Sequence, residues 1–169
     1  LLKIKSNDDV LDLCAAPGGK TAQLISLGAR VTSIDNNRKR LFKLEQNLKR
    51  LNYQAIIENK DIRNFSSQKT WPKIILDAPC SSTGTLRKNP EIMHQKKESD
   101  IISLSKLQSE LLDAAWNLLQ EGGTLLYCTC SLEKEEGEHQ IENFIKRKKN
   151  SLLDKINTNE IDKKLKTSN

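Results

Sequence analysis

Short apolar runs alternate with stretches of helical periodicity along most of the chain. The runs predict five strands, at Val10–Cys14, Arg30–Asp35, Ala55–Glu58, Lys73–Asp77 and Thr124–Thr129. The periodic stretches predict four helices, at Lys20–Leu27, Asn37–Leu51, Asp100–Leu119 and Lys134–Lys149. Such alternation predicts an α/β fold, a mainly parallel sheet with helices on both faces. Ligands of these sheets bind at the carboxyl edge, near a switch point that we expect between the first and fourth strands.

The composition narrows the class of protein. A net charge of +6 favours a polyanionic partner, although proteins from Lys- and Asn-rich proteomes share this balance. No stretch approaches the roughly 20 apolar residues of a membrane span, so we expect no membrane partner. The opening residues, LLKIKSNDDV, lack an initiator Met and the apolar part of a secretory signal. We therefore expect a cytoplasmic monomer with upstream sequence missing.

The cysteines are far apart in the sequence but share one predicted position. Cys14 ends the first strand, Cys80 follows the fourth, and Cys128 and Cys130 end the fifth. A disulfide framework is not expected in a leaderless domain of this size. A zinc site would use C-x2–4-C pairs, whereas the one close pair here is C-x-C, so we expect no metal. The pattern favours thiol chemistry at the carboxyl edge.

A glycine turn joins the first strand to the first helix in DLCAAPGGKTAQL, residues 12–24. Glycines let the backbone approach a ligand closely, and the following helix directs free N–H groups at it. An ordinary strand–helix connection would look similar. A nicotinamide dinucleotide site would need G-x-G-x-x-G and a P-loop would need G-x-x-x-x-G-K-[ST], and neither pattern is present.

Two carboxylates follow the second and third strands. Asp35 ends the second strand and can accept both hydroxyls of an adenosine ribose, as the acidic residue of dinucleotide folds does. It could also be the N-cap of the next helix, and we favour the ribose role. Asp61, after the third strand, is a candidate for holding an adenine amino group, although taken alone it is equally well an ordinary loop carboxylate.

Two further segments place reactive groups at the same edge. DAPCSSTGTLRKNP, residues 77–90, brings a carboxylate, a proline and a thiol within four residues. YCTCSLEKEEGE, residues 127–138, puts Cys130 just past the fifth strand, where a thiolate is favoured by neighbouring dipoles. Cys128 points to the same side but deeper, as a small packing residue. The acidic run after Ser131 also fits the first turn of a helix.

Taken together, these segments resemble the Sun (Fmu) family of RNA cytosine-5 methyltransferases. The resemblance rests on DLCAAPGGKT, on DAPCSSTG with RKNP, and on TCS followed by an acidic helix, and it covers residues 8–145. Within the family, the bacterial enzyme that acts on 16S ribosomal RNA is the most similar. The resemblance implies a Rossmann-like methyltransferase fold, S-adenosylmethionine as cofactor, and RNA, foremost ribosomal RNA, as partner.

The family pattern implies a role for each matching residue. Cys130 corresponds to the nucleophile, Cys80 to a second cysteine that helps to release product, and Asp77 to a group that binds the base. Cofactor contacts are implied at Cys14, Ala15, Ala16, Pro17, Gly18, Gly19, Lys20, Asp35, Asp61 and Asp77. Phosphates of RNA could be held by Arg87 and Lys88, or by the basic helix residues Arg38, Lys39, Arg40 and Lys43, which we favour as solvated charges.

Three parts of the family pattern are missing: an N-terminal RNA-binding domain, a methyltransferase motif just before the first strand, and a C-terminal hairpin with an Asp-Gly-Phe-Phe stretch. We interpret residues 1–149 as a catalytic domain truncated at both ends. Residues 150–169 are a Lys/Asn-rich, poorly ordered tail with at most a helical turn near Leu152–Ile156. The alternatives are a cofactor-binding remnant without transferase activity, a relative acting on transfer RNA and, less favoured, a nicotinamide-dependent oxidoreductase.

Overall fold

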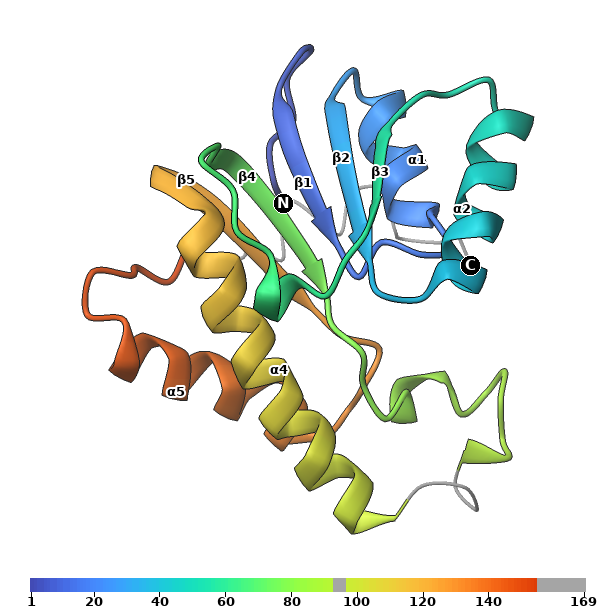
Figure 1. The fold of residues 1–169 in the computed structure, drawn as a ribbon. Helices are drawn as coiled ribbons and strands as arrows, with labels where there is room; N and C mark the ends of the chain where they lie inside the picture. The colour runs from blue at the N-terminus through green and yellow to red at the C-terminus, as the bar shows by residue number, and fades with distance from the viewer. Residues whose placement is uncertain (93–96, 155–169) are drawn as a thin grey trace, which may run out of the picture.

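The computed structural model describes residues 1–92 and 97–154, and within them a five-stranded sheet organises the chain (Figure 1). The strands are β1 (Asp9–Leu13), β2 (Arg30–Asp35), β3 (Ile56–Asn59), β4 (Trp71–Asp77) and β5 (Leu119–Cys128). Their order in the sheet is β3-β2-β1-β4-β5, and all four neighbouring pairs are parallel. The order reverses between β1 and β4, which confirms the predicted switch point.

Helices cover both faces of this sheet (Figure 1). They are α1 (Gly19–Ser26), α2 (Arg38–Arg50), α4 (Glu98–Leu118) and α5 (Glu138–Arg147), with short 3-10 turns η1 (Ile62–Asn64), η2 (Thr83–Thr85) and η3 (Lys134–Glu136). No helix within residues 1–92 and 97–154 is long and apolar enough to cross a membrane. The element types follow the predicted pattern, and the α/β fold class is confirmed.

Alternation along the central strands explains why both faces are covered. Leu11 and Leu13 of β1 pack on the side of α4, against a cluster that includes Leu112. Val10, the residue before Leu11, packs on the opposite face of the sheet with Leu24 of α1. Successive side chains of a strand point to opposite faces, so a strand with apolar side chains on both faces needs a helix on each side. Because all neighbouring strands are parallel, their carboxyl ends lie along one edge of the sheet.

The Gly122-Gly123 pair lies inside β5 rather than at the end of a helix. Helix α4 ends at Leu118, and β5 begins directly after it. The β4–β5 register shifts between Trp71, which pairs with Leu119, and Lys73, which pairs with Thr124, so β5 carries extra residues at this place. Gly122 there has φ of +71°, a backbone conformation that glycine adopts without steric cost. The helix therefore ends before the two glycines, which belong to the strand.

The two ends of the predicted last helix also differ from the structure. Helix α5 begins at Glu138, because the η3 turn precedes it, and it ends at Arg147. Residues 151–154 form no helix or strand, and Leu152 is almost fully exposed. The remainder of the predicted tail, including Ile156, lies outside the described residues.

Candidate active site

The turn after β1 is built for close approach by a ligand. Cys14 and Gly18 both have positive φ angles, of 57° and 97°. A Cβ atom at Gly18 would lie 2.8 Å from Cγ of Leu44, whereas one at Gly19 would meet nothing within 4 Å. The first position therefore requires glycine for packing. The second opens onto free space at the start of α1, where backbone N–H groups are available to a ligand.

Asp35 is held against this turn. Its carboxylate accepts the backbone N–H of Ala16 at 3.1 Å and that of Asn37 at 2.9 Å, and its residue is 3% exposed. The side chain of Asn37, not of Asp35, caps α2 by accepting the N–H of Arg40. The N-cap interpretation of Asp35 is therefore wrong. A carboxylate has about four lone-pair sites, so two acceptor positions remain on Asp35 for hydroxyl donors.

Arg40 forms the outer wall beside Asp35. Its guanidinium donates a hydrogen bond to the carbonyl of Ala16, and its Nη1 lies 3.9 Å from Oδ2 of Asp35. The sequence favoured a solvated charge at this position, with phosphate binding as the alternative. The side chain is about half exposed, as the solvated-charge interpretation predicts, and its guanidinium in addition contacts the predicted cofactor loop. Arg38, Lys39 and Lys43 are exposed, as predicted.

Asp77 ends β4 on the other side of β1 and faces the same turn. Its Oδ2 lies 2.6 Å from Nζ of Lys20, the second residue of α1. Its Oδ1 lies 3.6 Å from Sγ of Cys128, its register partner on β5. Both charged side chains are about two fifths exposed. The ion pair therefore joins two predicted cofactor residues that are 57 positions apart, at a place still open to solvent.

Asp61 lies at the same edge but is engaged by its own neighbour. Its carboxylate accepts hydrogen bonds from the backbone and guanidinium of Arg63, with Nη2 at 2.6 Å. The hydrogen bond from the Arg63 side chain keeps the pKa of Asp61 below its usual value. Arg63 also pairs with Glu110 of α4 at 3.2 Å. The carboxylate is thus ionised and fixed after β3, beside the end of β2.

Cys80 and Cys130 meet beyond the strand ends. Their Sγ atoms are 3.3 Å apart, although the residues are 50 positions apart in sequence. Sγ of Cys130 also lies 3.3 Å from Oγ of Ser82, and Cys130 is exposed. Burial, followed by the hydrogen bond with Cys130, raises the pKa of Cys80 above that of a free thiol. Cys80 is therefore a protonated thiol at neutral pH, in contact with an exposed partner.

The other two cysteines are suppressed as nucleophiles. Burial raises the pKa of Cys14 to about 12, and the nearby Asp35 charge adds to the effect. Burial likewise raises the pKa of Cys128 to about 12, with the Asp77 carboxylate as the next cause. The thiolate is the nucleophilic form, so neither residue supplies one near neutral pH. Cys128 also packs beside an apolar cluster, in agreement with the packing role predicted for it.

Asp12 is a buried carboxyl that the sequence did not single out as a functional residue. It is 0% exposed, and its Oδ2 accepts the hydroxyl of Thr21 at 2.6 Å. Among the described residues its Oδ1 has no hydrogen-bond partner. Burial raises the pKa of Asp12 to about 7. The position of Asp12 in the strand does not predict its burial, because the sequence does not show which strand residues α1 covers.

Replacing Asp12 by asparagine is expected to remove a pH dependence of stability. The folded-state pKa, about 7, exceeds the unfolded value of about 3.9, so the folded state keeps the proton longer. Unfolding free energy therefore falls as pH rises between these two values. From pH 5 to pH 8 the loss from this one group is roughly 2–3 kcal/mol. Urea unfolding of both proteins at the two pH values measures it. Equal pH dependence in the two proteins would contradict the assignment.

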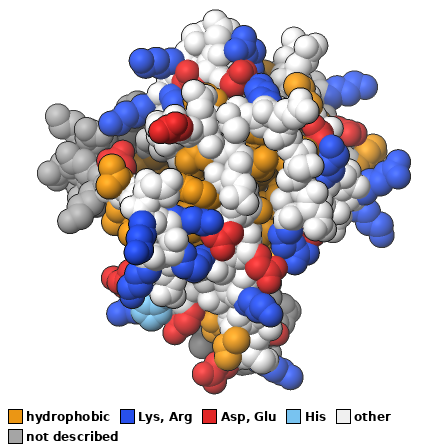
Figure 2. All heavy atoms as spheres, turned by 60° about the vertical axis from the view of Figure 1, so that its left-hand side comes forward, with side chains coloured by type: hydrophobic (Ala, Val, Ile, Leu, Met, Phe, Trp, Pro, Cys, Tyr) orange, Lys and Arg blue, Asp and Glu red, His pale blue; other side chains and the backbone are white. Residues whose placement is uncertain are grey.

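The predicted RNA-contact residues stand apart from these networks. Arg87 and Lys88 are exposed, in the segment that follows the η2 turn. The face drawn in Figure 2 carries interspersed basic and acidic side chains around hydrophobic ones, so the positive charge is not concentrated there. His139 is exposed, and His94 lies outside the described residues. Within residues 1–92 and 97–154, no three His, Cys, Asp or Glu side chains are grouped to hold a metal ion.

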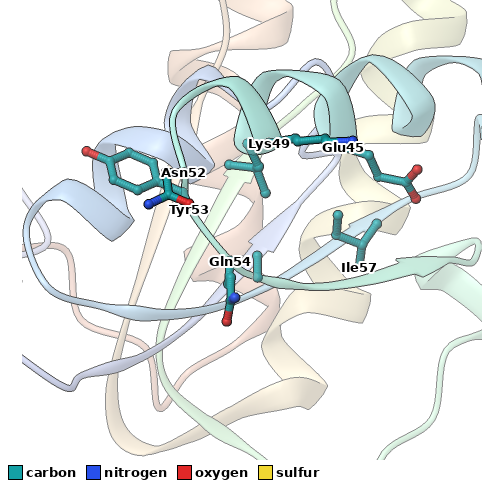
Figure 3. A pocket seen from close by; sticks show the side chains of 8 residues that line it. Glu45, Lys49, Asn52, Tyr53, Gln54 and Ile57 are labelled. Carbon is teal, nitrogen blue, oxygen red and sulfur yellow. The ribbon is translucent and has the colours of Figure 1, made fainter.

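A hollow between α2 and β3 is separate from this site (Figure 3). Its lining residues are Glu45, Leu48, Lys49, Asn52, Tyr53, Gln54, Ala55 and Ile57. Helix α2 begins next to Asp35 and runs away from the carboxyl edge, so the hollow lies at the opposite end of the helix. None of the predicted site residues lines it. Ligands of open α/β sheets bind at the carboxyl edge, which makes this hollow a poor candidate.

Comparison with known proteins identifies the family. Residues 1–169 match the family described as 16S rRNA methyltransferase RsmB/F. The ribosomal RNA small subunit methyltransferase B of Photorhabdus laumondii is 41% identical over 165 residues, which is 95% of this chain and 38% of the relative. The protein of the same description from Cronobacter sakazakii is 42% identical, over 91% of this chain and 37% of the relative.

Solved structures of other proteins are also similar to this chain. NSun6 from Pyrococcus horikoshii, solved with SFG, superimposes with a TM-score of 0.78 and is 33% identical, over 86% of this chain and 38% of that one. An rRNA methylase from Streptococcus thermophilus, 18% identical with a TM-score of 0.54, shares the fold. This chain spans less than two fifths of the length of its curated relatives. The chain belongs to the 16S rRNA methyltransferase RsmB/F family.

Proposed function

We propose that this chain transfers a methyl group from S-adenosylmethionine to carbon 5 of a cytosine in RNA, with 16S ribosomal RNA as the substrate. Cys130 is the nucleophile. The observation that carries the proposal is the meeting of the Cys80 and Cys130 thiols, 3.3 Å apart, beyond the strands whose ends hold Asp77 and Cys128. Membership in a family of 16S ribosomal RNA methyltransferases supports both the cofactor and the class of substrate.

The residues around the glycine turn fit this cofactor. Asp35 is positioned to accept the ribose hydroxyls, because two backbone N–H groups orient its carboxylate and leave acceptor sites unused. The open space at Gly19 admits the remainder of the molecule beside Lys20 and Asp77. An adenine amino group would bind Asp61 in place of part of its contact with the Arg63 guanidinium. When bound, the cofactor supplies an electrophilic methyl group on a sulfonium. Residues Cys14 to Lys20 form the backbone of this site.

The residue types match the chemistry that cytosine requires. Carbon 5 of cytosine is a poor nucleophile on its own. Addition of the Cys130 thiolate to carbon 6 breaks the conjugation of the ring and places electron density on carbon 5, which then accepts the methyl group. Asp77 binds the polar edge of the base and stabilises the adduct. The carbon-5 proton then passes to solvent, which reaches this edge, and the electrons of that bond reform the ring double bond. The carbon–sulfur bond breaks at the same time, and Cys80 protonates the departing sulfur.

Cys80 assists the release of product. Its raised pKa keeps its proton near neutral pH, and its contact with Cys130 puts that proton beside the departing sulfur. A protonated thiol at this place acts in general acid–base transfer. The base must leave its stack to reach these groups. Arg87 and Lys88, both exposed, hold the phosphates that flank it.

The direct test is methyl transfer followed by analysis of the product. The chain is incubated with S-adenosylmethionine that carries an isotope-labelled methyl group and with unmethylated ribosomal RNA, then the RNA is digested to nucleosides. We expect labelled 5-methylcytidine by mass spectrometry. Label in another nucleoside would overturn the cytosine assignment. Label in transfer RNA but not in ribosomal RNA would favour a relative acting on transfer RNA. Cofactor binding by calorimetry without any transfer would favour a remnant.

A further inference from the structure

A buried carboxylate connects the two loops that carry the thiols. Glu136 is 0% exposed and lies in the η3 turn, six residues after Cys130. Its oxygens accept the backbone N–H of Ser81 at 2.9 and 3.2 Å, and the Ser81 hydroxyl as well. They also accept Nε2 of Gln108, from α4, at 2.9 Å. Ser81 is the residue directly after Cys80, so the carboxylate binds that loop next to its thiol.

A second set of contacts joins the same two loops. The hydroxyls of Ser81 and Ser131 lie 3.1 Å apart, and those of Thr83 and Ser131 lie 3.2 Å apart. The backbone N–H of Gly84 donates to the carbonyl of Cys130 at 2.9 Å. A Cβ at Gly84 would lie 2.8 Å from that carbonyl oxygen, so the loops approach as closely as glycine allows. Each thiol is thus followed by a serine that is tied to the opposite loop.

Further hydrogen bonds hold Glu136 and its partner Gln108 in place. Its backbone carbonyl accepts the hydroxyl of Tyr127 at 2.7 Å, and Gln108 donates also to the carbonyl of Pro79. Burial raises the pKa of Glu136, but its hydrogen bonds with Ser131, Ser81 and Gln108 outweigh this and lower the pKa overall. A carboxylate that accepts several donors stays ionised even when buried. The acceptor is therefore present throughout the neutral range.

We propose that Glu136 is a positioning residue of the active site, whose carboxylate holds Cys80 in register with Cys130. It does not touch the base or the cofactor. It acts through Ser81 on the Cys80 thiol, and so on the proton transfer that accompanies release of product. The acidic run after Ser131 does lie in the first turn of a helical segment, as predicted, but the side chain of Glu136 is in addition buried toward the Cys80 loop. The proposal rests on the proposed function only for the catalytic part of its test.

The test pairs Glu136→Gln with Glu135→Gln, a matched change at the exposed neighbouring position. The carboxamide at position 136 turns an NH2 group toward donors, so the hydrogen bonds to Ser81 and Gln108 are disrupted with little change of volume. The first readout is independent of RNA. An azodicarboxamide oxidant takes two electrons and two protons from the two thiols, and mass spectrometry follows the Cys80–Cys130 disulfide. We expect the Glu136→Gln protein to form it at least about tenfold more slowly, because the sulfurs are no longer held together.

The second readout is methyl transfer. A misplacement of about 1 Å at a reacting group costs on the order of 100-fold in rate, so we expect a fall of that order in kcat with KM for S-adenosylmethionine unchanged. Glu135→Gln should match the wild type in both readouts. Ser81→Ala, which loses the hydroxyl and keeps the backbone N–H, should shift both in the same direction by less. If Glu136→Gln does not fold, as judged by circular dichroism, Ser81→Ala decides.

A wild-type rate of disulfide formation in a folded Glu136→Gln protein would overturn the proposal. A rise in KM for the cofactor as large as the fall in kcat would also overturn it, because that would indicate a general loss of structure. If the wild-type chain transfers no methyl group, the proposed function fails while the disulfide readout still measures the position of the thiols. The two failures are therefore distinguishable.

Discussion

Replacing Cys130 by alanine is expected to abolish a covalent adduct that the wild-type chain forms with RNA containing 5-fluorocytosine. In the wild type, addition of the thiolate at carbon 6 and methylation at carbon 5 leave that carbon with a fluorine and a methyl group, and no proton. The elimination step cannot then occur, and the enzyme stays attached to the RNA. Without the Cys130 sulfur no carbon–sulfur bond forms. Denaturing gel electrophoresis with labelled RNA and S-adenosylmethionine detects the shifted band.

Cys130→Ala should also reduce methyl transfer to natural RNA by several orders of magnitude, as the loss of a covalent nucleophile does in other enzymes. Cys128→Ala is the matched control. This thiol lies two residues earlier, but burial raises its pKa to about 12, so its removal should leave the trapped band in place. A trapped band in the Cys130→Ala protein would exclude Cys130 as the nucleophile.

The expected catalytic edge was predictable because strand ends are marked in the sequence. Asp35 and Asp77 are the last residues of β2 and β4, and Cys80 and Cys130 follow strands that are hydrogen-bonded neighbours. Parallel strands align their carboxyl ends, so the order of elements was sufficient to bring these groups to one edge. The distance of 3.3 Å between the two thiols depends on the loops beyond the strands, which periodicity does not describe.

Two side-chain contacts that sequence reasoning did not predict share a physical feature. Arg40 and Glu136 are charged residues in segments of high charge, where solvated side chains are the common case. Arg40 stays about half exposed but also contacts the carbonyl of Ala16, and Glu136 is buried against the N–H of Ser81. Their partners are backbone groups of distant loops, and backbone groups carry no signature in the sequence. One signal was available for Glu136, a charged residue that sits close behind a predicted nucleophile.

Replacing Cys80 by alanine should have the opposite effect to the loss of Cys130. Addition and methylation use Cys130, so both proceed in the Cys80→Ala protein. Removal of the carbon-5 proton and expulsion of the thiol lose the group that contacts the departing sulfur. We therefore expect an adduct with ordinary cytosine RNA that survives denaturing electrophoresis and grows with time in the presence of S-adenosylmethionine, whereas the wild type shows only a trace.

The double variant Cys80→Ala with Cys130→Ala tests whether the band comes from the Cys130 adduct or from an incidental crosslink. It should show no band, because the adduct cannot accumulate if the bond between Cys130 and carbon 6 never forms. The raised pKa of Cys80 points the same way, since a thiol that keeps its proton is a poor first nucleophile and still carries that proton after the adduct has formed. If instead Cys80→Ala abolishes trapping and Cys130→Ala accumulates the natural adduct, the roles of the two thiols are exchanged. Release of product would then depend on the exposed sulfur, and the raised pKa of Cys80 would have to be overcome by the bound base.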